Sequence, residues 1–188
     1  TTIGQVLFTG LLEAVAGWTS FAYFDDMLID DTTGELAKAP VPDRRFLLLT
    51  PNGNGTNSEM TGSDGNQVDN YALAAEVPND GDTTYVKALT PALTDTYAMT
   101  TIAIPDDWAI AAVVGMNIAR KSAAEDAVEV SVTLQSGAVK AVGAAQALGT
   151  SYGMKWQRWT TDPNTGFAWL QAGIDAVEVG ATSAGTFA

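Results

Sequence analysis

The chain contains no histidine and no cysteine among its 188 residues. Without imidazole or thiol groups it cannot build a Ser-His-Asp or Cys-His nucleophile, or a zinc site from Cys or His. It also has no cysteine that could form a disulfide, so the sequence does not indicate whether the protein works in an oxidising or a reducing compartment. Carboxylates are the main groups left for acid–base or metal chemistry.

Basic residues are also scarce, because 9 Lys and Arg stand against 22 Asp and Glu, for a formal net charge of −13. A nucleic-acid-binding protein needs cationic side chains to displace counterions from phosphate, and this chain has few. An anionic membrane surface repels an acidic chain because the two charges have the same sign. No apolar run approaches the roughly 20 residues of a membrane helix. We therefore expect no direct contact with nucleic acid and no contact with a membrane.

The N-terminus, Thr1–Gln5, lacks the basic region of a secretory signal. A first residue of Thr is what removal of an initiator Met leaves, which predicts a mature cytosolic product. Hydrophobic residues make up 46% of the chain and charged residues 16%, a balance that favours a folded protein over a disordered one.

The length fits one domain with an extension, and we divide the chain into an N-terminal arm, 1–44, and a body, 45–188. We expect the arm to be mostly irregular, with one amphipathic stretch that attaches the protein to a neighbour. The apolar residues of this stretch recur at the spacing of one helix face and end near a tryptophan. They are Phe8, Leu11, Leu12, Val15 and Trp18.

The body alternates apolar and polar residues between turns rich in Gly, Pro and Asn, which predicts an all-β, antiparallel β-sandwich. The candidate strands are 71–77, 83–89, 96–104, 114–119, 128–135, 139–144, 152–160 and 177–179. The Gly- and Asn-rich stretch 52–70 predicts a long loop. One short C-terminal helix is expected at 168–176.

Aromatic residues gather in the C-terminal third. Alternation places Trp156 with Tyr152 and Met154 on a face typical of a core, and Trp159 on the opposite face. Trp159 and Trp169 are therefore candidates for a subunit interface or for stacking on a sugar ring. The alternative is that these side chains fill the core.

Acidic residues offer two possible sites. Asp80 and Asp82 are weak calcium candidates, because they lack the spacing of a twelve-residue calcium loop and fit a solvated turn better. Glu76 and Glu129 fall in candidate strands and could form a glycosidase pair, but the sequence does not set the separation of about 5–9 Å that this chemistry requires. Glutamates on a wetted sheet face are commoner. We expect no enzyme activity, no metal and no cofactor.

Arg120 and Lys121 form the only basic pair besides Arg44–Arg45. They fit either a solvated turn or an ion pair with an acidic neighbouring subunit. Both residues are candidates for an interface.

An ordered series of turn motifs resembles that of tailed-bacteriophage structural proteins over about residues 46–182. The motifs lie at 51–55, 62–66, 70–71, 76–86, 119–122, 143–148, 160–169 and 176–180. The resemblance implies a jelly-roll-like sandwich on the virion, as a decoration (cement) protein of the capsid. The alternative is a head or tail fibre or spike component with a carbohydrate-binding sandwich.

The acidic composition is compatible with this resemblance, because negative charge suits the outside of a capsid better than its DNA-lined inside. We expect a homo-oligomer, a trimer, that is assembled in the host cytoplasm and binds the major capsid protein or another virion protein. Many modest contacts repeated by symmetry give durable attachment.

Overall fold

The computed structural model describes residues 45–124 and 127–187, which are mostly β, with antiparallel sheets and two short helices. The predicted all-β, antiparallel class is confirmed at this level. Residues from Leu47 onward form one compact unit. The candidates Phe8, Leu11, Leu12 and Trp18 lie outside the described residues.

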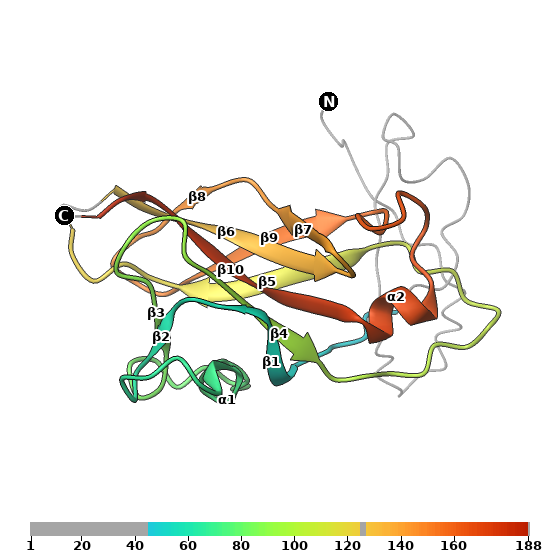
Figure 1. Ribbon diagram of the computed structural model, residues 1–188, viewed down its shortest axis with the longest axis horizontal. Helices are drawn as coiled ribbons and strands as arrows, with labels where there is room; N and C mark the ends of the chain where they lie inside the picture. The colour runs from blue at the N-terminus through green and yellow to red at the C-terminus, as the bar shows by residue number, and fades with distance from the viewer. Residues whose placement is uncertain (1–44, 125–126, 188) are drawn as a thin grey trace, which may run out of the picture. The chain divides into compact units, whose positions relative to one another are not determined.

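The largest sheet runs in the order β1, β4, β10, β6, β7, and β8 pairs with β6 off that path (Figure 1). Every pairing in this sheet is antiparallel, and β6 and β10 are paired along their whole length. The strands are β1 (Pro51–Ser58), β4 (Thr94–Met99), β6 (Ala127–Ser136), β7 (Val139–Val142), β8 (Gln146–Ala147) and β10 (Val177–Thr186).

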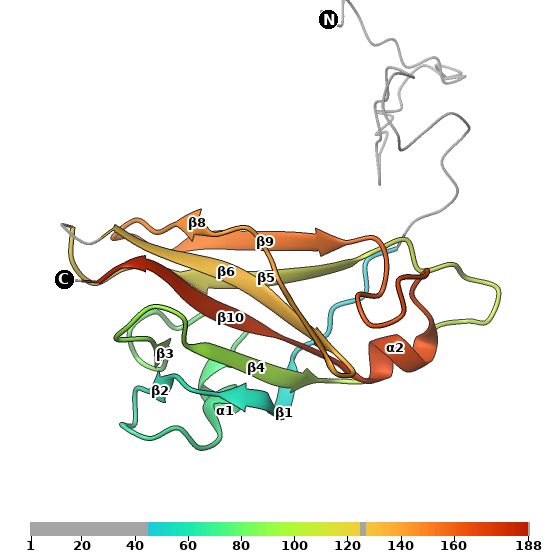
Figure 2. The same ribbon diagram turned by 45° about the horizontal axis from the view of Figure 1, so that its top comes forward.

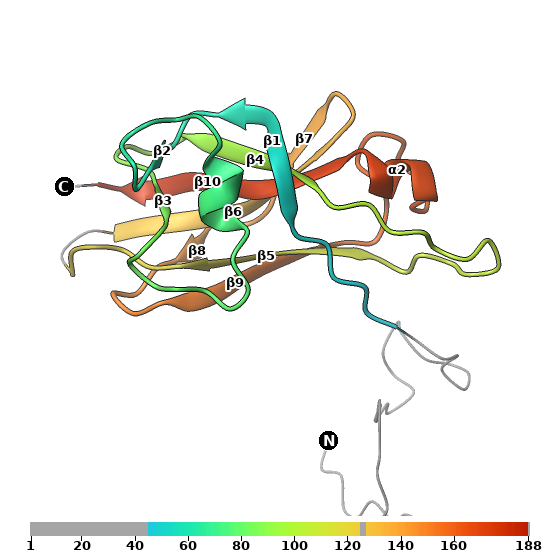
Figure 3. The ribbon, with the colours of Figure 1, turned by 90° about the horizontal axis from the view of Figure 1, so that it is seen from below.

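A separate two-stranded ribbon, β5 (Val113–Ala119) with β9 (Gly153–Trp159), packs across one face of β6 and β10. Figures 2 and 3 show it as a second layer beside the large sheet. Two very short strands, β2 (Thr61–Gly62) and β3 (Val86–Lys87), pair near the β1 edge.

The hydrophobic core lies between this ribbon, the large sheet and helix α2 (Gln171–Asp175). Its buried members are Leu134, Trp169, Ile174 and Val177. Half-buried side chains pack around them; they are Leu49, Met99, Ile104, Ile110, Val113, Trp159 and Val179. Burial of apolar area stabilises this arrangement by about 25 cal/mol per Å² removed from water.

Two expectations for the region before β4 are wrong. The stretch 52–70 is not one long loop, because 51–58 form strand β1, and 71–77 do not form a strand, because Asn70–Ala74 are helix α1. The polar residues of β1 fit a strand because they hydrogen-bond the sheet: Thr56 donates to Glu178. The predicted C-terminal helix is present as α2, shorter than expected.

Gly115 sets the distance between the ribbon and the sheet. A Cβ atom at this position would lie 2.8 Å from Val132 Cγ1, 3.1 Å from Val179 Cγ1 and 3.2 Å from the Trp159 ring. Contacts this close leave no room for a methyl group. The absence of a side chain at Gly115 therefore lets β5 approach the sheet closely enough for its neighbours to share the core.

We expect Gly115→Ala to lower the free energy of unfolding by about 1–3 kcal/mol, because the new methyl group pushes the ribbon away from the sheet. Urea unfolding followed by tryptophan fluorescence measures the change. Gly153→Ala is the matched control in the same ribbon, since nothing lies within 4 Å of a Cβ there. Equal stability of the two variants would contradict the close approach.

Candidate functional site

The outward side of the β5–β9 ribbon is a continuous apolar surface. In the antiparallel register Met116 lies opposite Trp156 and Ile118 opposite Met154, while Val114 lies opposite Arg158. The outward apolar side chains, called the outer ribbon face below, are 43% to 61% exposed; they are Val114, Met116, Ile118, Met154 and Trp156. Contiguous apolar surface of this kind marks interaction sites more often than scattered residues do.

The ribbon also differs from the rest of the chain in charge. The chain holds 22 acidic residues, yet neither β5 nor β9 contains one. The charged residues of the two strands are Lys155, which donates to the Ala147 carbonyl oxygen, and the exposed Arg158. The two strands of the ribbon themselves therefore add no acidic group that would repel a second copy of this acidic chain.

The structure reverses the predicted roles of two tryptophans. Trp156 lies on the exposed face with Met154, and Trp159, the predicted interface or sugar-stacking residue, packs against the core. The alternation itself was predicted correctly, but both faces of β9 carry large apolar residues. Gly115 identifies the inward face of the ribbon. It lies on the same face of β5 as Val113, which packs against the core, and it lies close to Val132 and Val179 of the large sheet.

Trp169 is also wrong as a candidate ligand platform. Its side chain is only 2% exposed, and its indole N–H donates to the Trp159 carbonyl oxygen at 2.9 Å. A ring buried in this way cannot stack on a ligand. Its role is to fill the core and to fix the end of β9.

A polar cluster stands at the end of the ribbon away from Arg158. The Arg120 guanidinium donates to Asp82 at 2.8 Å, and the Tyr152 hydroxyl donates to the same carboxylate at 2.7 Å. The guanidinium also lies over the Tyr152 ring, 5.4 Å from its centre. Arg120 thus has an acidic partner within its own chain, and Lys121 donates to the Ala124 carbonyl oxygen in the same turn.

These contacts change the acidity of the cluster. The Tyr152 hydrogen bond, followed by that of Arg120, lowers the pKa of Asp82. The bonds to Asp82 raise the pKa of Arg120, and burial raises the pKa of Tyr152. The carboxylate of Asp82 already pairs with the Arg120 guanidinium, and the carboxylate of Asp80 accepts a hydrogen bond from the Thr84 N–H. Both groups therefore have partners within the chain, and the pair does not suit calcium.

The two glutamates considered for glycoside chemistry lie on separate elements. Glu76 belongs to the loop after α1, where it accepts hydrogen bonds from Thr84 and from the Asp80 N–H. Glu129 lies in β6, opposite Ala184 of β10. Among residues 45–124 and 127–187, no three His, Cys, Asp or Glu side chains group as metal ligands.

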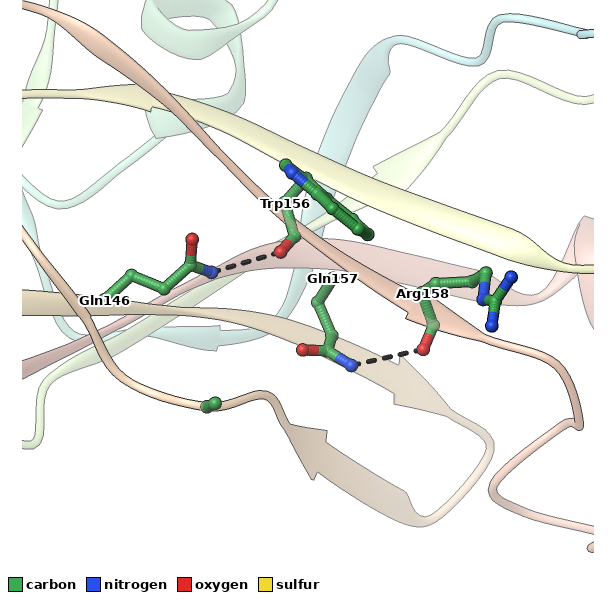
Figure 4. Close-up of a pocket in the computed structure, with 5 residues that line it drawn as sticks. Gln146, Trp156, Gln157 and Arg158 are labelled. Carbon is green, nitrogen blue, oxygen red and sulfur yellow. Dashed lines mark hydrogen bonds between the residues drawn. The ribbon is translucent and has the colours of Figure 1, made fainter. Parts of the chain in front are cut away.

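A cavity of about 590 Å³ opens at the free edge of β9, lined by Ala144, Gln146, Trp156, Gln157 and Arg158 (Figure 4). The Gln146 side-chain amide donates to the Trp156 carbonyl oxygen at 3.1 Å, and the Gln157 amide donates to the Arg158 carbonyl oxygen at 3.1 Å. The first bond attaches β8 to the ribbon and covers an edge that would otherwise be open to strand pairing.

A buried carboxylate joins β4 to the segment that follows β1. Asp95 is 1% exposed and accepts at Oδ1 from the backbone N–H groups of Glu59 and Met60, both at 2.7 Å. At Oδ2 it accepts from the Asn70 amide at 2.6 Å and from the Tyr97 hydroxyl at 3.3 Å. Four donors compensate the cost of burying the charge, so we interpret Asp95 as structural.

In the part of the chain that the structure describes, no helix is both long enough and apolar enough to cross a membrane. Comparisons with protein-family models, with curated proteins and with solved structures find nothing that matches the chain. The function must therefore be argued from the surface of the protein itself.

We expect Asp95→Asn to lower the free energy of unfolding by about 3 kcal/mol, because an amide NH₂ would face other donors in a buried site. Urea unfolding at neutral pH measures this loss. Asp107→Asn, on an exposed loop, is the control and should change stability by less than about 0.5 kcal/mol. A fully stable Asp95→Asn variant would contradict the structural role.

Tyr97 predicts a loss of stability at alkaline pH. Burial, and then the negative charge of Asp95, raise the pKa of the Tyr97 hydroxyl well above its usual value. Above about pH 10 the unfolded chain releases this proton while the folded chain keeps it, so stability falls by up to about 1.4 kcal/mol per pH unit. Urea unfolding from about pH 9 to about pH 11 should show a shallower fall for Tyr97→Phe. Identical pH slopes would refute the assignment.

Proposed function

We propose that this protein is a structural subunit that assembles with copies of itself through the outer ribbon face. The observation that carries the proposal is the apolar surface formed by Met116, Ile118, Met154 and Trp156 in an acid-free part of an acidic chain. Covering such a surface removes apolar area from water, which drives association. No bond-making chemistry is required for this role.

The composition of the ribbon favours a second copy as the occupant. The outer ribbon face pairs Met116 with Trp156 and Ile118 with Met154 across its two strands. If two copies pack face to face about a two-fold axis, this apolar surface meets itself, and no acidic residue of β5 or β9 opposes another. A two-fold arrangement of this kind is self-complementary in apolar surface.

The setting that we propose is the exterior of a tailed-phage particle, where the protein acts as a decoration protein with a jelly-roll-like sandwich. The ordered turn motifs of 46–182 and the net charge of −13 support this setting. A decoration protein needs a stable module with an adhesive surface, and the antiparallel sheets and the outer ribbon face meet these two needs. Its second contact would be the major capsid protein.

The double variant Ile118→Glu/Met154→Glu should convert the assembled protein to a monomer, because four like charges would meet in each pair. Light scattering coupled to size-exclusion chromatography over a range of concentrations measures the mass. Val68→Glu is the control, since Val68 is an equally exposed apolar residue away from the ribbon.

The wild-type chain and the Val68→Glu variant should have the same mass, that of two chains or of the three expected from the sequence. A trimer would mean that the outer ribbon face packs on a different surface of its neighbour. A monomeric wild-type chain at every concentration, or a double variant that still assembles, would overturn the proposal.

A further inference from the structure

Methionine is the only sulfur-containing residue of this chain, which has five methionines and no cysteine. Four of them lie within the residues that the structure describes, and their environments differ. Met60 is 6% exposed, and Met99 is half-buried against the core. Met116 and Met154 are 50% and 61% exposed. Two thioethers are therefore open to water, and both belong to the outer ribbon face.

The two exposed thioethers occupy neighbouring positions on that face. Met116 lies opposite Trp156 and Met154 lies opposite Ile118, so the two methionines form a diagonal pair in the antiparallel register. Diagonal positions on adjacent strands are within reach of long side chains. A chemical change at these two sulfurs therefore alters two adjoining side chains of the apolar surface that the proposed assembly uses.

We propose that Met116 and Met154 form a reversible oxidation site that converts the outer ribbon face from apolar to polar. A peroxide transfers one oxygen atom to the sulfur: the O–O bond breaks, an S–O bond forms, and hydrogen peroxide leaves as water. The sulfur loses two electrons, which the peroxide gains. The product is a sulfoxide, a polar group that accepts hydrogen bonds. A sulfoxide reductase restores the thioether with a dithiol as electron donor, which yields a disulfide and water.

The sulfoxides oppose assembly because of the surface that they occupy. In a face-to-face pair they would be removed from water against a surface made mostly of aliphatic and thioether side chains. Burying a polar group without a hydrogen bond costs free energy, so oxidised copies associate more weakly. The chain thereby acquires a redox response although it has no thiol.

Burial separates this site from oxidative damage to the core. A sulfoxide at Met60 or Met99 would place a polar group in the interior and lower the stability of the fold. A sulfoxide at Met116 or Met154 leaves the core intact, because these side chains point away from it. The fold should therefore stay equally stable while the outer ribbon face changes character.

The effect on association rests on the proposed assembly, whereas the position of the modification and the change in polarity do not. Two kinds of readout are therefore combined on the full-length chain. Peptide mass spectrometry and retention on a hydrophobic-interaction column report the site and the polarity in dilute protein. Light scattering coupled to size-exclusion chromatography over a range of concentrations reports association.

Hydrogen peroxide should oxidise Met116 and Met154 about tenfold faster than Met60 in the dilute chain, because exposure controls access to the sulfur. The oxidised chain should elute earlier from the hydrophobic-interaction column. The dissociation constant of the assembly should rise at least about tenfold. Treatment with sulfoxide reductase and dithiothreitol should reverse both changes.

Three outcomes would overturn the proposal. They are oxidation of Met60 as fast as Met116, unchanged column retention once both exposed sulfurs are oxidised, and an assembly whose dissociation constant does not respond to that oxidation. A monomeric untreated chain would overturn the proposed assembly instead, and the peptide map and the column would then decide the oxidation site alone.

A conservative double variant assigns the response to these two sulfurs. Met116→Leu/Met154→Leu keeps the apolar surface, so it should assemble like the wild-type chain and should not respond to peroxide. It retains the other three methionines of the chain. The matched control is Met99→Leu, which removes a half-buried thioether and should keep the full response. An equal peroxide response in the double variant and the wild-type chain would contradict the assignment.

Discussion

The close contact of the β5–β9 ribbon with the large sheet determines which surfaces this protein hides and which it shows. At Gly115 the backbone of β5 comes so near Val132 and Val179 that a methyl group would not fit. Because strand side chains alternate, fixing one inward residue fixes the whole ribbon. Trp159 then joins the core and Trp156 points outward, so the same contact both completes the core and creates the outer ribbon face.

The polar contacts around the ribbon confine it without covering that face. Asn117 donates to the Gly180 carbonyl oxygen, which attaches β5 to the sheet. On the other edge Gln146 and Lys155 connect β8 and β9. Every one of these bonds lies at an edge or on the inward side, so the apolar outer surface stays open for a partner. A surface positioned so firmly loses little conformational entropy on binding.

The fold class and most of the later strands could be predicted from alternation and turn residues, and the short C-terminal helix was predicted as well. Strand β1 could not, since its Gly- and Asn-rich sequence suggests a loop and only its bonds to Glu178 and β4 make it a strand. Sequence alternation also could not decide which side of β9 faces inward, because Trp156 and Trp159 are equally apolar. Burial depends on the second layer, which a single strand does not reveal. Asp82 and Arg120 are 38 positions apart, so their pairing follows from the fold alone.

Hydroxyl-radical footprinting read by mass spectrometry tests the central claim, that the outer ribbon face is open in the single chain and covered in the assembly. In dilute protein, Met116, Met154 and Trp156 should be oxidised readily, whereas Trp159 and Trp169 should be protected. In concentrated protein the first three should lose most of this labelling. Stronger labelling of Trp159 than of Trp156, or labelling of the outer ribbon face that does not change with concentration, would contradict the account.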